Sequence, residues 1–463
     1  MRVLKRVTPT PEQLKIITID PSGIILIRGA AGSGKTTTAL LRLKHLTKYW
    51  SLHHRRVAGG ENVRILVLTY NRTLRGYVEA LAAEQVELDG VILEVRTFAG
   101  WARSLLGDPW INDNTSGMIG GLGQKLPLQR DFLINEVAYA LGRFMPEDIE
   151  QYLDTLRVGR GVSPRVEKPL RHRIVEEVIR PYWGWKQRER IWDWNDLAVA
   201  LARKKLSAYD VIIVDEAQDF SANQMRAVLN HLAPEHSLTL VLDAAQRIYP
   251  NAFRWREVNI AVTNTNTFRL AQNYRNTIEI AQFAAPLLAG LELTDDGTVP
   301  DFRATERHGP TPVVITGRYR DQLTFAIQYI RDNVDLENES VAFLHLKGHG
   351  WFDATRTALQ EAGLPFAEIT QNSEWPKGGE NIALSTMHSA KGLEFDHVII
   401  IGFNGELTPH GQEVGDDDLE KLRRLTAMAF GRARKSILLG YKPDDRSALI
   451  NLLDPNSYSA IAV

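Results

Sequence analysis

The sequence predicts an α/β protein built from parallel sheets, with polar motifs at the carboxyl ends of the strands. Two apolar runs carry this prediction, because residues 24–27 read Ile-Ile-Leu-Ile and residues 211–214 read Val-Ile-Ile-Val. Runs of this length and β-branched content are typical of buried parallel strands. Each run leads into a motif rich in glycines or acids, at 29–36 and at 215–219. Since α/β sheets bind ligands beyond the carboxyl ends of their strands, both motifs fall where a site is expected.

Composition places the chain among ordinary globular proteins. Its 463 residues are 44% hydrophobic and 24% charged, and this length corresponds to roughly three domains. No apolar run approaches the ~18 residues of a membrane helix, and no signal-peptide core follows the basic start. The lack of cysteine excludes disulfides, iron–sulfur clusters and thiolate zinc sites. We therefore expect a cytoplasmic protein without a membrane partner.

The net charge is −1, so any contact with nucleic acid must come from a local basic region. One such region is residues 157–190, which contains ten Lys or Arg and four Asp or Glu, together with Trp183 and Trp185. Two interpretations fit this region. It is either a nucleic-acid-binding surface or a solvated helix face whose aromatic residues fill a local core.

Residues 29–36 match the phosphate-binding loop pattern G-x-x-x-x-G-K-[ST], between an apolar strand and a helix-compatible run at 37–45. Its glycines let the backbone turn tightly and aim N–H groups at phosphate oxygens beside a helix N-terminus. Lys35 is expected to reach the β- and γ-phosphates, and Thr36 to hold Mg²⁺. The alternative, a Gly-rich turn without a ligand, is disfavoured by the flanking strand and helix. The expected nucleotide-binding residues of this loop are Gly29, Ala30, Ala31, Gly32, Ser33, Gly34, Lys35, Thr36 and Thr37.

The second motif, Asp-Glu-Ala-Gln-Asp at 215–219, carries the carboxylates that phosphoryl transfer needs. Transfer requires Mg²⁺ that bridges the phosphates and a group that orients the attacking water. Asp215 is the expected metal-side carboxylate and Glu216 the expected base, while Gln218 and Asp219 suggest a site that reports nucleotide state elsewhere. The alternative is a strand that ends in a solvated acidic turn, and the presence of the phosphate loop argues against it.

Together, these motifs and others in the same order resemble the UvrD/Rep-like branch of superfamily one helicases, over most of the chain. The resemblance implies two RecA-like P-loop domains with parallel sheets, plus a small helical insertion in the first. The expected first domain is residues 1–106 plus 191–268, the insertion is 107–190, and the second domain is 269–463. The chain is short for this family, and the second large accessory insertion of the family is expected to be absent.

The motifs of the first half imply contacts with the base of the nucleotide and with nucleic acid. Thr-Pro-Glu-Gln at 10–13 resembles the adenine-reading segment, which places Gln13 at the base edge. Residues 238–249 resemble the coupling motif, with Asp243 and Gln246 in place and Leu242 where the family usually has Gly. The resemblance implies nucleic-acid contacts from Thr69, Asn71, Thr97, Phe98, Tyr249, Trp255 and, in the second half, His388.

The motifs of the second half imply charged groups that complete the nucleotide site. Leu-Ala-Gln-Asn-Tyr-Arg at 270–275 would point Arg275 at the γ-phosphate. Residues 384–395 would place Glu394 at the ribose and Lys391 near nucleic acid or the seam between the domains. Residues 427–435 would supply Arg432 as an arginine finger, although Gly431 stands where the family usually has Thr.

The resemblance therefore implies an ATP- and Mg²⁺-dependent DNA helicase or translocase that steps along single-stranded DNA from 3′ to 5′. The partners would be single-stranded DNA or a DNA junction, and a protein partner such as a nuclease or a repair or defence subunit. Two alternatives stay open, a DNA- or partner-sensing ATPase switch that does not unwind, and an RNA helicase. Taken singly, each arginine could be an ion-pair residue and each aromatic a core residue. The expected catalytic residues are Lys35, Glu216, Gln246, Arg275 and Arg432.

Overall fold

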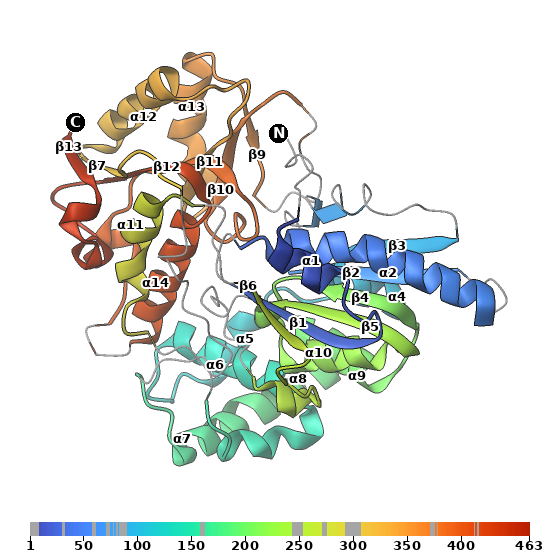
Figure 1. Cartoon of the computed structure of the whole chain (residues 1–463). Coiled ribbons are helices and arrows are strands. Elements are labelled where there is room, and N and C mark those ends of the chain that lie inside the picture. Colours follow the sequence, from blue (N-terminus) through green and yellow to red (C-terminus); the bar gives the residue numbers. More distant parts are fainter. Residues whose placement is uncertain are drawn as a thin grey trace.

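The computed structural model contains two parallel sheets and a group of helices beside the first sheet (Figure 1). It describes residues 9–29, 33–57, 62–70, 75–76, 78–79, 82, 90–157, 163–242, 253–270, 276–291, 307–370, 376, 378–411, 413 and 416–463. All strand pairings within both sheets are parallel over these residues. Among the same residues, no helix is both long and apolar enough to cross a bilayer.

The first sheet has the strand order β3-β2-β4-β5-β1-β6. The strand that ends at the phosphate loop, β1, lies between β5 and β6, and the strand that ends at the acidic motif, β4, lies on the other side of β5. The two motifs therefore leave the same edge of the sheet, one strand apart. The strands are β1 (Gly23–Gly29), β2 (Val63–Thr69), β3 (Val91–Thr97), β4 (Tyr209–Val214), β5 (Leu232–Leu242) and β6 (Thr267–Leu270).

Helices cover both faces of this sheet because successive strand residues point to opposite sides. On β1, Ile25 and Ile27 pack with the helix α2 that follows the phosphate loop, whereas Leu26 packs with helices on the other face. These helices are α4, α9 and α10. The helices of this half are α1 (Pro11–Ile17), α2 (Lys35–Val57), α4 (Phe98–Leu106), α9 (Trp194–Arg203) and α10 (Ala222–Asn230), with 3₁₀ turns η3 (Ala217–Asp219) and η5 (Trp255–Val258).

A separate helical group lies between α4 and α9 in the chain and has its own core. Val137, Val178 and Tyr182 are fully buried in that core. The group begins and ends side by side, because Ile111 and Trp192 form a parallel β-bridge. Its elements are α5 (Thr115–Leu122), α6 (Arg130–Arg143), η1 (Pro146–Leu153), α7 (Lys168–Arg173), the π-helical turn η2 (Ile174–Ile179) and α8 (Arg180–Glu189).

The second sheet has the order β13-β7-β12-β11-β8-β10-β9. Its strands are β7 (Val313–Thr316), β8 (Val341–His345), β9 (Phe366–Glu368), β10 (Ile382–Thr386), β11 (Phe395–Ile400), β12 (Ala433–Tyr441) and β13 (Ser459–Ala462). The helices α11 (Ile278–Leu288) and α14 (Asp417–Phe430) pack on one face, and α12 (Tyr319–Asn333) and α13 (Asp353–Glu361) on the other. Short 3₁₀ turns are η7 (His349–Phe352), η8 (Gly405–Leu407), η9 (Ala448–Leu452) and η10 (Pro455–Ser457).

The predicted fold class, two parallel-sheet α/β domains with a helical insertion in the first, is confirmed. The exact domain boundaries stay predictions. The last strand of the first sheet, β6, ends at Leu270, two residues past the expected boundary at 268.

Candidate active site

The phosphate loop joins the end of β1 to the start of α2, as its sequence predicts. Ala30, Ala31 and Gly32 lie outside the described residues. Gly34 has a φ of +77°, a left-handed conformation that favours glycine, and a Cβ there would lie 2.5 Å from Gln13 Nε2. A Cβ on Gly29 would lie 2.8 Å from the carbonyl oxygen of Leu270. Gly34 is therefore required by its backbone conformation and Gly29 by the close approach of the Leu270 backbone, and Thr37 follows in the first turn of α2.

Gln13 is buried against this loop, in the first turn of α1. The backbone N–H of Thr10 donates to Gln13 Oε1 at 3.0 Å, and the backbone N–H of Gln13 donates to Thr10 Oγ1 at 3.3 Å. This capping box fixes the amide so that its Nε2 faces Gly34. Its role as an adenine contact stays a prediction.

Arg42, which sequence analysis missed, fastens α1 to the helix of the phosphate loop. From α2, its guanidinium donates to the carbonyl oxygens of Ile16 at 2.9 Å, Ile19 at 3.0 Å and Asp20 at 2.9 Å. Burial lowers the pKa of Arg42 to about 10, which leaves it charged at neutral pH. A helical arginine gives no sign of this role in the sequence, because its acceptors are main-chain atoms 22–26 residues away.

Thr36, at the start of α2, and Asp215, just after β4, meet at the carboxyl edge of the first sheet. Thr36 Oγ1 lies 3.0 and 3.1 Å from the two carboxylate oxygens of Asp215. Burial and the neighbouring negative charge of Glu216 raise the pKa of Asp215 to about 7. The positive charge around this carboxylate is therefore too small to offset these two effects. Carboxylate and hydroxyl oxygens are ligands that Mg²⁺ prefers, and Mg²⁺ commonly takes one or two protein ligands plus substrate phosphates. The donor set therefore fits Mg²⁺.

Glu216 is held in a strained conformation beside Gln218. Its φ of 53° and ψ of 41° are left-handed, which is uncommon outside glycine and is found at functional sites. Gln218 Nε2 donates to Glu216 Oε2. Burial alone would raise the pKa of Glu216, but the positive charges of Lys391, Lys35 and Arg432 hold it below its ordinary value. Glu216 is therefore an ionised carboxylate inside the protein.

Lys391 brings the second sheet into this site. It follows β10 and is almost fully buried, and its Nζ lies 2.5 Å from Asp219 Oδ2 and 3.8 Å from Glu216 Oε2. Asp219 belongs to the acidic motif of the first half, in η3. The site is therefore built from both sheets, at the seam between them.

Arg432 approaches from the same side, at the turn between α14 and β12. Its Nε donates to the carbonyl oxygen of Met428 at 3.1 Å and its Nη1 to that of Leu393 at 3.2 Å. The backbone N–H of Phe395 donates to the carbonyl oxygen of Arg432 at 3.0 Å, so Glu394 and Arg432 are fixed side by side. Arg275, Gln246 and Asp243 lie outside the described residues.

A β-bulge follows Glu394 and Arg432 directly. Phe395 pairs with Ala433 but His397 pairs with Ser436, so Arg434 and Lys435 oppose Asp396 alone. Bulges of this kind bend a strand and re-aim its side chains, and they are frequent beside active sites.

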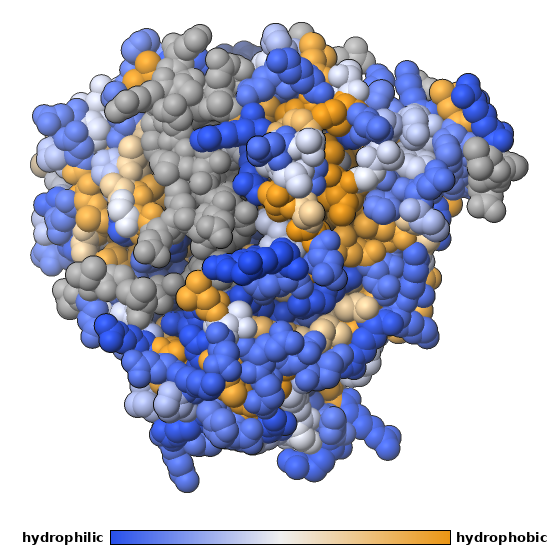
Figure 2. All heavy atoms as spheres, turned by 60° about the horizontal axis from the view of Figure 1, so that its bottom comes forward, coloured by the Kyte–Doolittle hydropathy of each residue, from blue (hydrophilic) through white to orange (hydrophobic). Residues whose placement is uncertain are grey.

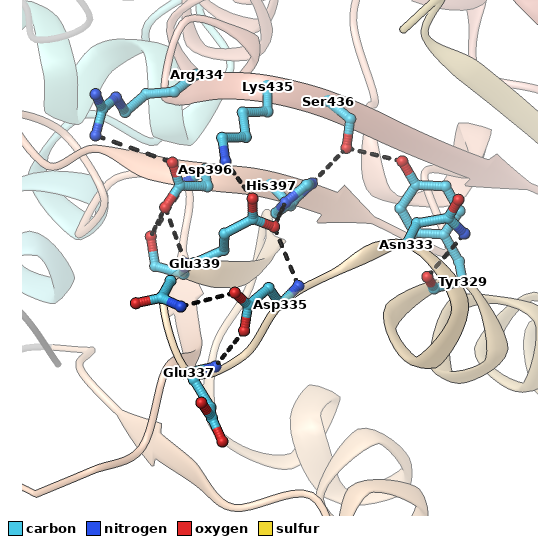
Figure 3. A network of polar contacts seen from close by, with 12 residues as sticks. Tyr329, Asn333, Asp335, Glu337, Glu339, Asp396, His397, Arg434, Lys435 and Ser436 are labelled. Atoms are coloured by element: carbon cyan, nitrogen blue, oxygen red, sulfur yellow. Dashed lines mark hydrogen bonds and ion pairs between the residues drawn. The ribbon is translucent and has the colours of Figure 1, made fainter.

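A polar network holds the bulge (Figure 3). His397 Nε2 lies 2.9 Å from Glu339 Oε2, and its Nδ1 lies 2.8 Å from Ser436 Oγ. Lys435 Nζ donates to Glu339 Oε1, and Tyr329 donates to Ser436 Oγ at 2.9 Å. The network therefore ties the starts of β11 and β12 to the loop before β8. The residues of this network lie far apart in the sequence, so no sequence motif predicts the network.

The residues expected to contact nucleic acid divide into three groups. Phe98 and Trp255 are buried, and the Trp255 ring packs edge-on against Phe253 at 5.2 Å, so neither ring faces solvent. Thr69 is buried and Thr97 caps α4, whereas His388 is exposed. Asn71 and Tyr249 lie outside the described residues. These nucleic-acid contacts stay predictions, and a base could stack on Phe98 or Trp255 only after their packing changed.

Five of the basic residues in the region at 157–190 form ion pairs with acids near them. Hydrophilic residues dominate the face that carries the helical group in Figure 2. Trp183 and Trp185 are partly buried against the core of the helical group, which favours the local-core interpretation. The ion pairs are Arg157–Glu136 at 2.8 Å, Lys168–Asp154 at 2.6 Å, Arg173–Glu177 at 2.7 Å, Arg180–Glu176 at 2.8 Å and Lys186–Asp193 at 2.8 Å.

Comparison with known proteins gives two matching families. The AAA domain family matches residues 13–252, and the UvrD-like helicase C-terminal domain family matches residues 359–443. The ATP-dependent DNA helicase Rep is 42% identical over 71 residues in Buchnera aphidicola and 33% identical over 70 residues in Escherichia coli. Each of these matches covers 15% of this chain and 10% of the relative. The ATP-dependent DNA helicase UvrD2 of Mycobacterium bovis is 22% identical over 570 residues, covering 93% of this chain and 78% of that protein.

Proposed function

Since this chain belongs to the UvrD/Rep-like family of superfamily one helicases, we propose that it is an ATP-dependent translocase or helicase on single-stranded DNA. One observation carries the proposal. Thr36, Asp215 and Glu216 come from the first sheet, and Lys391 and Arg432 reach the same site from the second. A nucleotide bound there would contact both sheets, so its hydrolysis would change how they fit together.

Binding begins at the start of α2. The backbone N–H groups of the phosphate loop and the positive end of the helix face the phosphates, and Lys35 reaches the β- and γ-phosphates. Thr36 and Asp215 would hold Mg²⁺, which when bound neutralises charge on the phosphate oxygens. Gln13, which its capping box holds in place, would contact the base of the nucleotide and discriminate adenine from other bases.

Hydrolysis uses the charged groups at the seam. Glu216 orients the attacking water and takes up its proton, while the amide of Gln218 fixes the carboxylate. Arg432, with Arg275, would balance the negative charge that develops on the transferred phosphoryl group. Since Arg432 comes from the second sheet, hydrolysis is fast only when the sheets are closed on the nucleotide.

Coupling to movement would follow from the pair Lys391–Asp219. When the γ-phosphate leaves, the charges that Lys391 and Arg432 face change, and the two halves separate or rotate. Single-stranded DNA that contacts both halves would then be stepped, in the 3′ to 5′ direction that the family resemblance implies. A nuclease or a repair or defence subunit as a partner stays a prediction.

The test is steady-state ATP turnover of the full chain without nucleic acid, with single-stranded DNA and with single-stranded RNA. Lys35→Ala should abolish turnover, while Lys48→Ala, an exposed lysine on the same helix, should behave as wild type. Stimulation by DNA alone supports the proposal, and equal or greater stimulation by RNA would change the substrate to RNA. Turnover that neither polymer changes would contradict a nucleic-acid motor and favour an ATPase switch that senses a protein.

A further inference from the structure

An ion pair joins the helical insertion to the segment that follows the coupling motif. Arg143 is the last residue of α6, and Glu257 lies in η5, after the residues 238–249 that resemble that motif. Arg143 Nε donates to Glu257 Oε2 at 2.8 Å, and its Nη2 donates to Glu257 Oε1 at 2.7 Å. The Arg143 side chain is 3% exposed and that of Glu257 is 21% exposed, so little water reaches the contact.

Both members of this pair are ionised. Burial opposes the charge of Arg143, but the bonds to Glu257 outweigh burial and raise the pKa of Arg143 above its ordinary value. Burial also opposes the charge of Glu257, and Arg143 holds the pKa of Glu257 below its ordinary value. Two parallel charged hydrogen bonds fix the orientation of the partners as well as their distance, which the ammonium of a lysine cannot do.

Helix α10 contacts both members of the pair and lies beside α6 (Figure 1). Arg226 Nη1 donates to the carbonyl oxygen of Arg143 at 2.8 Å, and its Nη2 donates to that of Glu257 at 3.2 Å. Asn223 is fully buried, and its Nδ2 donates to two carbonyl oxygens at the end of α6, at 2.9 and 2.8 Å. The insertion, α10 and η5 are therefore joined at one point.

This point lies between the acidic motif and an expected nucleic-acid contact. Ser221 caps the start of α10, and a Cβ on Gly142 of α6 would lie 3.0 Å from Ser221 Cβ. Two residues before Ser221 is Asp219, which pairs with Lys391 in the nucleotide site. On the other side, η5 carries Trp255, whose buried Nε1 has no hydrogen-bond partner among the described residues. The Trp255 ring is therefore held by the packing of η5.

We propose that Arg143 is a positioning residue that couples nucleic-acid binding to ATP hydrolysis, because it holds η5 against α10. The inference goes beyond the proposed function and rests on it, since only an ATPase that nucleic acid stimulates has this coupling. Arg143 acts through Glu257. Because the bidentate pair keeps one geometry, a shift of α10 when the nucleotide changes would move η5 with it, whereas a loose contact would absorb the shift.

The test is steady-state ATP turnover of the full chain with and without saturating oligo-dT or oligo-U, whichever stimulates the wild type more. The quantity compared is the ratio of kcat with the polymer to kcat without it. Arg143→Met should lower this ratio by about tenfold, with the turnover in the absence of polymer and the KM for ATP close to wild type. Glu257→Gln, which keeps the shape of the side chain, should lower the ratio by about threefold.

Arg171→Met is the matched control for a loss of stability. Arg171, in α7 of the same helical group, donates to the carbonyl oxygens of Tyr152 at 3.0 Å, Thr155 at 2.7 Å and Val166 at 2.8 Å. These bonds stay within the helical group and do not involve η5. Arg171→Met should therefore lower the temperature of thermal unfolding but keep the wild-type ratio, because a merely structural arginine does not affect the coupling.

The outcomes separate the inference from the proposed function. If neither polymer stimulates the wild type, both are overturned. If the wild type is stimulated but Arg143→Met and Glu257→Gln keep its ratio, the inference is overturned and the proposed function stands. If Arg171→Met lowers the ratio as much as Arg143→Met, the ion pair is merely structural and the inference is overturned. If circular dichroism shows that Arg143→Met is unfolded, the ratio of Glu257→Gln decides.

Discussion

Lys391 Nζ lies 2.5 Å from Asp219 Oδ2, and this ion pair joins the second sheet to the acidic motif of the first. Both side chains are almost fully buried. Solvent therefore screens the pair little, and a change at either residue reaches the other half directly. Because Glu216 lies 3.8 Å from the same ammonium, the pair also sets the charge around the expected catalytic base.

Lys391→Met should destabilise the protein, because it removes a buried cation that faces the buried carboxylates of Asp219 and Glu216. The expected loss is about 3 kcal/mol in the free energy of unfolding, measured by urea denaturation. Lys168→Met removes a lysine from an exposed ion pair with Asp154 and should cost less than about 1 kcal/mol. Adding Asp219→Asn to Lys391→Met should recover part of the loss, and full additivity of the two changes would show that the pair is not coupled.

Thr36→Val should make ATP turnover depend on higher Mg²⁺ concentrations, because it removes the hydroxyl that faces Asp215 at 3.0 Å. The Mg²⁺ concentration for half-maximal turnover should rise by about tenfold or more, and Thr36→Ser should behave close to wild type. A titration of turnover against Mg²⁺ measures both. Identical titrations for Val and Ser would exclude the hydroxyl from metal binding.

Arg42→Met should loosen α1 from α2, because four carbonyl oxygens in and after α1 lose their donor. We expect a rise of about tenfold in the KM for ATP, weaker discrimination between ATP and GTP, and a loss of about 2 kcal/mol in stability. Arg55→Met changes an exposed arginine on the same helix and serves as the control. If stability falls but discrimination between ATP and GTP is unchanged, Arg42 does not position the base-reading segment.

Glu339→Gln should alter stability in acid. Burial raises the pKa of Glu339, but hydrogen bonds from Lys435 and His397 outweigh this and hold it at about 2. A carboxyl with a depressed pKa adds stability that is present above its ordinary pKa of 4.5 and lost as pH falls toward 2. The variant should therefore lose less stability than wild type between these values. Glu368→Gln changes a more exposed carboxyl, in β9 and paired with Arg356 of α13, and should keep the wild-type profile. If the two variants show the same pH profile, Glu339 does not have the low pKa that the network gives it.

The fold and the phosphate- and metal-binding part of the site could be predicted, because short stretches of sequence specify them. The phosphate loop and the acidic motif each follow an apolar strand, so sheet geometry brings Thr36 and Asp215 together. The helical insertion could also be expected, since it interrupts the order of the motifs.

Other features depend on tertiary packing that no local pattern reveals. Phe98 and Trp255 carry the residue types of a base-stacking site, yet both rings are buried in the core. Five basic residues of the basic region pair with acids, some as far away in the sequence as Glu136 and Asp154. Arg42 bonds to main-chain oxygens, and His397 bonds to side chains up to 58 residues away in the sequence. Short sequence motifs do not reveal contacts of either kind.

The most direct test of a nucleotide site shared by both sheets is the ATP turnover of Arg432→Ala with saturating single-stranded DNA. We expect a fall of about 10³-fold in kcat with little change in KM, because Arg432 acts on the transition state. Arg320→Ala, an exposed arginine of α12, should turn over ATP as wild type does. If Arg432→Ala keeps the turnover of the wild type, Arg432 contributes nothing to hydrolysis, and a catalytic site shared by both sheets through this arginine is contradicted.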